Sequence, residues 1–137
     1  MNKIILCITL FIILIITNYI LNYKSEFFSL KHKNLLVTSA GDNTNFDKLW
    51  CQNGRNYDIW VVYYGNNEDN YQKYSKKVDY IEKRKGSKFQ NFHHIYNTKS
   101  EELQNYDRFF ILDDDIIFET PDINKMFEIS EKYNLDI

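Results

Sequence analysis

Three consecutive carboxylates, Asp113 to Asp115, stand between two apolar runs in the stretch YDRFFILDDDIIFETPD. The apolar residues from Phe109 to Leu112 predict a buried strand, so folding brings these acids close to the core. Two carboxylates about 6 Å apart repel by about 3 kcal/mol at an effective dielectric constant of about 20. Because alternate side chains of a strand face the same way, we expect Asp113 and Asp115 to point to one side. Such a pair suits a hard divalent cation, Mg²⁺ or Mn²⁺, which takes oxygen ligands and shares them with substrate phosphates.

Other interpretations of the acidic triplet stay open. The acids could be solvated loop residues whose negative charge suits the helix expected from Pro121. An EF-hand loop fits poorly, because counting from Asp113 places Phe118 where that loop needs glycine and Asn124 where it needs glutamate. A haloacid-dehalogenase-type phosphatase also has a hydrophobic strand followed by D-x-D, but Ile117 stands where that motif normally has Thr or Val.

Apolar runs alternate with helical patterns along the chain, which predicts an α/β domain with a mainly parallel sheet. The expected strands are NLLVTSAG, YDIWVVYYG, the weaker VDYIEKRKG, and RFFIL, and the last residues LDI look like the start of another. Helices are expected in TNFDKLWCQ with Thr44 as cap, from Ser87 onward, and after Thr120 and Pro121, while NNEDNYQKYSKK fits either a loop or a short helix.

The helix after Ser87 is expected to bury one apolar side, made of Phe89, Phe92, Ile95 and Tyr96. Ligands of parallel α/β sheets gather at the carboxyl ends of the strands. Gly41 with Asp42, Gly65 and the acidic triplet all fall at such ends, so we expect them to meet at one edge of the sheet.

The first residues form a separate apolar segment. Ile4 to Leu21 is mostly apolar, and 18 residues of helix at about 1.5 Å each span roughly 27 Å, close to the thickness of a bilayer core. We expect a transmembrane signal-anchor at residues 1–23, a stem at 24–32 and a globular domain at 33–137. A cleaved signal peptide is the alternative, but the residues after the apolar run are not the small ones that cleavage requires. Lysines flank the span on both sides, and counting them favours a cytoplasmic globular part.

Composition excludes several classes of function. The net charge of -2 gives no sign of bulk nucleic-acid binding, and 44% hydrophobic residues with a single proline indicate a folded chain. Cys7 lies in the apolar span and Cys51 in the globular part, so no internal disulfide is expected.

An apolar strand that ends in D-x-D after two β-α units resembles the GT-A type of nucleotide-sugar glycosyltransferase. The chain also resembles the glycosyltransferase-like family known as domain of unknown function family 707, in the order and spacing of the blocks RNYDIWVVYYG, KGSKFQ, YDRFFILDDDI and DINKMFEISEKYNLDI. The resemblance covers roughly residues 33 to 137. It implies a Rossmann-like GT-A nucleotide-binding half with a mainly parallel sheet.

The resemblance also implies roles for the matching positions. Asp113 and Asp115 would hold a divalent metal that bridges the diphosphate of a sugar nucleotide, with Asp113 nearer the ribose. Other positions would contact the nucleotide or its phosphates: Ser39 and Gly41 after the first strand, Asp58 or the strand end at Gly65, and Lys85 and Lys88 around Gly86 and Ser87. The two lysines could equally belong to a solvated basic face, and the glycines could be turn residues.

GT-A domains generally continue well beyond D-x-D, and their later half contacts the acceptor. We therefore expect a truncated domain that by itself at most binds metal and nucleotide, which leaves enzyme activity open. The first hypothesis is a type II membrane-anchored glycosyltransferase with a lumenal soluble part, in the Golgi or endoplasmic reticulum of a eukaryote, acting on an unknown acceptor. A secreted protein is the alternative location.

Two other functions are weighed against it. One is a non-catalytic membrane-tethered binding or assembly module that associates through an open sheet edge. The other is a phosphatase-like hydrolase with Asp113 as nucleophile.

Overall fold

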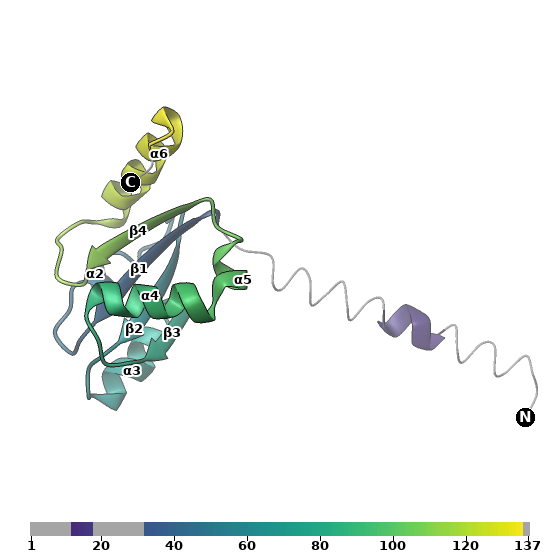
Figure 1. Ribbon diagram of the computed structural model, residues 1–137, viewed down its shortest axis with the longest axis horizontal. Coiled ribbons are helices and arrows are strands. Elements are labelled where there is room, and N and C mark those ends of the chain that lie inside the picture. The colour runs from purple at the N-terminus through teal and green to yellow at the C-terminus, as the bar shows by residue number, and fades with distance from the viewer. Residues whose placement is uncertain (1–11, 18–31, 136–137) are drawn as a thin grey trace, which may run out of the picture. The chain divides into compact units, whose positions relative to one another are not determined.

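The computed structural model describes residues 12–17 and 32–135. It divides the chain into two units, Met1–Leu30 and Lys31–Ile137. Residues 12–17 are helical, and all the labelled elements belong to the second unit (Figure 1). Within the described ranges no helix is long and apolar enough to cross a membrane. The predicted span, Ile4 to Leu21, lies mostly outside those ranges.

A sheet of four parallel strands forms the centre of the second unit. The strands are β1 (Asn34–Ala40), β2 (Asp58–Tyr63), β3 (Tyr80–Lys83) and β4 (Arg108–Asp113). Their order in the sheet is β3-β2-β1-β4, and every pairing is parallel. The predicted α/β class with a mainly parallel sheet is confirmed, and the arrangement is consistent with a Rossmann-like fold.

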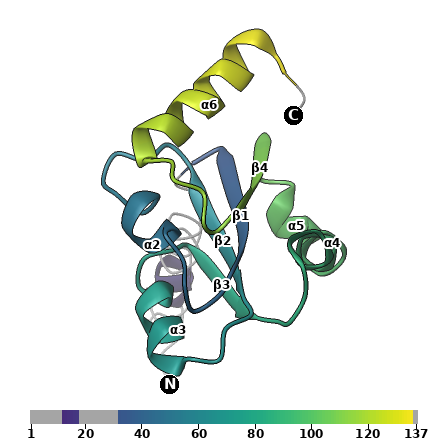
Figure 2. The same cartoon turned by 90° about the vertical axis from the view of Figure 1, so that its left-hand side faces the viewer.

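Five helices connect and follow the strands: α2 (Phe46–Leu49), α3 (Glu68–Ser75), α4 (Lys88–Thr98), α5 (Ser100–Leu103) and α6 (Thr120–Tyr133). Figure 2 shows α2 and α3 on one side of the sheet and α4 and α5 on the other. The segment NNEDNYQKYSKK, for which the sequence allowed either a loop or a short helix, contains helix α3. The Asn67 side chain caps this helix by accepting from the backbone N–H groups of Asp69 and Asn70. The helix expected from Ser87 is α4, which Ser87 and Gln90 close with a capping box.

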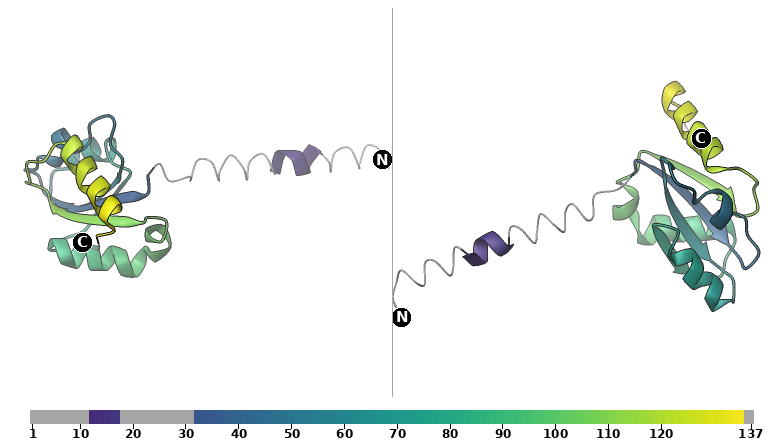
Figure 3. Two further views of the ribbon diagram at one scale, coloured as in Figure 1. Left: turned by 90° about the horizontal axis from the view of Figure 1, so that it is seen from above. Right: turned by 180° about the vertical axis from the view of Figure 1, so that it is seen from behind.

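The larger part of the core lies between the sheet and helices α2, α3 and α6. Alternate strand residues face it, and aromatic side chains fill it: Leu36, Ala40, Ile59, Val61 and Phe110 from the strands, with Phe46, Trp50, Tyr74, Ile123 and Phe127 from or beside the helices. Phe127 of α6 stacks on Phe110 of β4 with ring centroids 4.1 Å apart. Helix α6 is therefore fixed on the side of the sheet opposite to α4, as the left view of Figure 3 shows.

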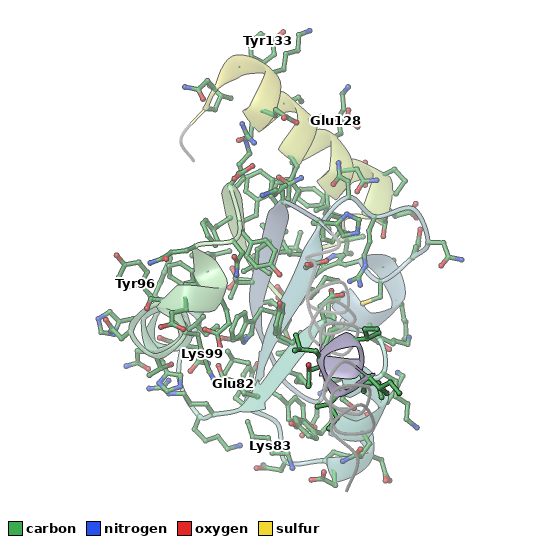
Figure 4. All side chains as sticks on the ribbon, turned by 90° about the vertical axis from the view of Figure 1, so that its right-hand side faces the viewer. Glu82, Lys83, Tyr96, Lys99, Glu128 and Tyr133 are labelled. Carbon is green, nitrogen blue, oxygen red and sulfur yellow. The ribbon has the colours of Figure 1, made fainter. Side chains whose placement is uncertain are left out.

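The buried side of α4 agrees with the predicted one at Ile95 but differs from it at Phe89 and Tyr96. Asn91 and Ile95 are buried, whereas Phe89 is 69% exposed and Tyr96 61% exposed. Figure 4 shows Tyr96 pointing away from the sheet. The prediction followed apolarity alone, whereas Asn91 faces inward and donates a hydrogen bond to Ser39 of β1, which places positions 91 and 95 on the buried side.

Two predicted helix caps are also wrong. Thr120 is the first residue of α6 rather than its cap, because Glu119 and Asp122 form the capping box and the Thr120 hydroxyl donates to Leu49 O at 3.0 Å. Asn45, not Thr44, occupies the cap position of α2 and makes no side-chain cap bond. Of the expected final strand, Leu135 is described and belongs to the helix end, where its N–H donates to Ser130 O at 3.0 Å. Asp136 and Ile137 lie outside the described residues.

Candidate functional site

The carboxyl ends of β2, β1 and β4 lie side by side at one edge of the sheet. The register pairs Ala40 with Tyr63 and Ser39 with Asp113. This pairing brings together the segments that follow β1, β2 and β4. Gly41, Gly65 and the acidic triplet therefore meet at one edge, as the order of elements predicts.

The three acids of the triplet have different environments. Strand β4 ends at Asp113, and the N–H of Ile116 donates to Asp113 O at 3.2 Å to close a turn over Asp114 and Asp115. The alternation of a strand therefore does not extend to Asp115. The Asp113 carboxylate is 56% exposed and lies 2.7 Å from Lys88 Nζ, and Asp115 is exposed.

Asp114, the central acid, points toward the first loop of the domain. Its Oδ2 accepts from the backbone N–H of Gly41 at 2.9 Å. Its backbone carbonyl accepts from Thr44 Oγ1 at 2.8 Å and from the N–H of Asn45 at 3.0 Å. Burial raises the pKa of the Asp114 carboxyl above its ordinary value. Asp114 thus ties the triplet to the loop after β1 and leaves the two outer acids facing solvent.

Asp42 holds the loop after β2; the sequence places it at this edge beside Gly41, but without a predicted role. Its carboxylate accepts from the Tyr63 hydroxyl and from the backbone N–H groups of Asn66 at 3.1 Å and Asn67 at 3.2 Å. The hydrogen bond from Tyr63, followed by that from Asn66, lowers the pKa of Asp42 to about 2. An Asp directly after a small-residue strand end was the available signal, but its partners lie in another loop.

The two glycines of this edge are required by close packing against the protein itself. A Cβ on Gly41 would lie 2.9 Å from Tyr64 Oη, and a Cβ on Gly65 would lie 2.4 Å from Tyr63 Oη and 2.5 Å from Asp42 Oδ1. The structure thus gives both glycines a packing role, and their contact with a nucleotide stays a prediction.

The start of α4 brings two lysines to the same edge. Lys88 pairs with Asp113, as described above. The Lys85 ammonium donates to Tyr64 O, to Asn66 Oδ1 at 2.8 Å and to Gly65 O at 3.4 Å. Both cations therefore lie beside the strand ends, and the free N–H groups at the start of α4 add a partial positive charge there.

Asn91 anchors this part of α4 and is a residue that sequence reasoning missed. It is 1% exposed, and its Nδ2 donates to Ser39 Oγ at 2.9 Å and to Gly86 O at 3.1 Å. Its Oδ1 accepts from Arg84 Nη1. Ser39, predicted to make room for a nucleotide, is 8% exposed and is bonded inward to Asn91.

Asp58 does not join the other predicted site residues. It is the first residue of β2, so it lies at the amino end of the sheet. There it is 3% exposed and accepts from the Tyr106 hydroxyl at 2.9 Å. Burial, with the bonds to Tyr80 and Asp58, raises the pKa of Tyr106. Asp58 therefore has a structural environment far from the acidic triplet.

The donor set of the triplet suits one kind of metal binding. In the part of the chain that the structure describes, no group of three or more His, Cys, Asp or Glu side chains could hold a metal ion. Two exposed carboxylates with hard oxygen donors fit Mg²⁺ or Mn²⁺ that is completed by phosphates and water. The oxygen donors of Asp113 and Asp115 are of the kind that these ions take, and the binding of a metal by them stays a prediction.

Comparisons with protein families, with curated proteins and with solved structures find no match to this chain.

Proposed function

We propose that the globular part binds the diphosphate of a sugar nucleotide together with Mn²⁺ or Mg²⁺, as the donor site of a membrane-anchored glycosyltransferase. The proposal is carried by two exposed carboxylates, Asp113 and Asp115, and two lysines that lie at the carboxyl edge of a parallel sheet, with Lys88 paired to Asp113. The proposed location is a type II membrane protein with a lumenal soluble part, with a secreted protein as the alternative.

Each group at the edge has a part in this proposal. Asp113 and Asp115 would hold the metal, which would supply positive charge to stabilise the nucleoside diphosphate as leaving group. Lys88, Lys85 and the first N–H groups of α4 attract the phosphates. Asp114 and Asp42 do not bind ligand but fix the two loops against each other.

Calorimetric titration of the full chain in detergent with UDP, with and without Mn²⁺, tests the proposal. We expect binding that requires Mn²⁺ and that Asp115→Asn abolishes. Asp107→Asn is the matched control, because Asp107 is an exposed acid at the opposite end of β4. Binding that survives Asp115→Asn, or that Asp107→Asn removes equally, contradicts the proposal.

A second function, a non-catalytic binding module, is favoured by one observation. Two hollows of about 420 and 460 Å³ lie along β4, one of the two edge strands of the sheet, and both are lined by Phe92 and Phe109. An apolar partner strand would suit such an edge. This function predicts partner binding that the double variant Asp113→Asn, Asp115→Asn leaves unchanged, in contrast to the titration above.

A further inference from the structure

The ion pair between Lys88 and Asp113 occupies the carboxylate that the proposed metal would need. Lys88 Nζ lies 2.7 Å from Asp113 Oδ2, and the Lys88 side chain is only 23% exposed although it carries a charge. Its ammonium also lies 5.2 Å from the centre of the Phe89 ring. The lysine is thus placed over the end of β4 rather than extended into solvent.

We propose that Lys88 is the counter-cation of Asp113 in the free protein. When a metal–diphosphate complex binds, the Lys88 ammonium leaves Asp113 and pairs with a phosphate of that complex. This inference rests on the proposed function, because it concerns the same carboxylates. It adds that the site discriminates against a bare metal ion and favours a metal that brings a phosphate.

The Lys88 ammonium and a metal ion would compete for the Asp113 carboxylate. A Mg²⁺ ion lies about 2.0–2.1 Å from a ligand oxygen, so a metal on Asp113 and an ammonium still bonded to it would lie within a few ångströms of each other. A single and a double positive charge at that distance repel even in water-like surroundings. A bare metal must therefore displace Lys88 without replacing its partner, whereas a metal–diphosphate complex supplies a new anionic partner for it.

Lys83 provides the matched control for the loss of one positive charge. It ends β3 and pairs with Glu68 of α3, so it is near the same edge but its partner is not an acid of the triplet. Lys88→Met and Lys83→Met change the net charge equally. Only Lys88→Met removes the competitor of the metal.

Lys88→Met is expected to change the affinity for Mn²⁺ alone and the affinity for Mn²⁺ with UDP in opposite directions. Lys88→Met should bind Mn²⁺ alone about tenfold more tightly than the wild type, from the loss of charge repulsion and of the ion pair. The same variant should bind Mn²⁺ with UDP at least severalfold more weakly than the wild type, because a phosphate partner is lost. Lys83→Met should stay within about twofold of the wild type for both probes. A variant that had simply lost its fold would lose both affinities together.

The experiment is a titration of the full chain in detergent with Mn²⁺, in which electron paramagnetic resonance counts the free ion, repeated with saturating UDP. Unchanged or weaker binding of Mn²⁺ alone by Lys88→Met, with Mn²⁺–UDP binding by the wild type that Asp115→Asn abolishes, overturns the inference and leaves the proposed function standing. Absence of Mn²⁺ binding by the wild type and by Lys88→Met, with and without UDP, overturns both.

Discussion

Asn91 is the buried polar residue that seats α4 on the sheet, and replacing it with leucine tests that role. The two side chains are similar in size, so the change removes hydrogen bonds with little change in volume. It removes the bonds to Ser39 Oγ, to Gly86 O and from Arg84 Nη1. Each is worth about 0.5–1.5 kcal/mol net, and partners left buried without a bond add to the cost. We expect Asn91→Leu to lower the free energy of unfolding by about 2–4 kcal/mol.

Urea denaturation of the full chain, followed by the fluorescence of Trp50 and Trp60, measures this loss. Asn97→Leu is the matched control, since Asn97 is exposed on the same helix and its side chain bonds only to His93. We expect the control to change the free energy of unfolding by less than about 0.5 kcal/mol. Because Lys88 lies on the same helix, Asn91→Leu should also weaken the binding of Mn²⁺ with UDP.

A loss of less than about 1 kcal/mol for Asn91→Leu, or a loss no larger than that of Asn97→Leu, would contradict this role of Asn91. Either result would mean that apolar contacts alone seat α4. In that case the apolar residues predicted to face the sheet would have to be reconsidered, and Ile95 would be the first to test.

Three further outcomes follow from the contacts of single residues. The pKa of Asp42 is lowered to about 2 from 3.8, so its contribution to stability is complete above about pH 4 and is lost as the pH falls toward 2. Asp42→Asn should therefore flatten the dependence of the unfolding free energy on pH between about 4 and 2. An unchanged slope would contradict this role of Asp42. Phe127→Ala should lower the free energy of unfolding, measured by urea denaturation, by about 3–5 kcal/mol because Phe127 is 1% exposed. Ile129→Ala, at a position 40% exposed on the same helix, should lower it much less, and similar losses for the two variants would contradict the packing of Phe127. Gly65→Ala should lower the free energy of unfolding by about 1–3 kcal/mol, since its new methyl group would lie 2.4 Å from Tyr63 Oη, and a neutral result would show that this side chain moves aside easily.

Local sequence signals were sufficient wherever a feature depends on neighbouring residues. The runs that include Asn34–Ala40 and Arg108–Asp113 are strands as predicted, and the Ser87 capping box starts α4. The predicted buried side of α4 is confirmed at Ile95 and wrong at Phe89 and Tyr96, because the polar Asn91 has partners in β1 and at Gly86 that apolarity does not reveal. The prediction of Thr120 as a cap is wrong because its hydroxyl donates to Leu49 O instead.

The α/β class, the order of elements and the placement of the acidic triplet at a strand end could all be predicted from the residues, because periodicity and turn residues act over a few positions. The contacts of each acid, in contrast, follow from the folded arrangement. Asp114 turns to Gly41, 73 positions away, Asp113 meets Lys88, 25 positions away, and Asp58 lies at the amino end of its strand, where Tyr106 covers it. These contacts depend on strand order and register, which bring together loops that are distant in the chain and which no local pattern encodes.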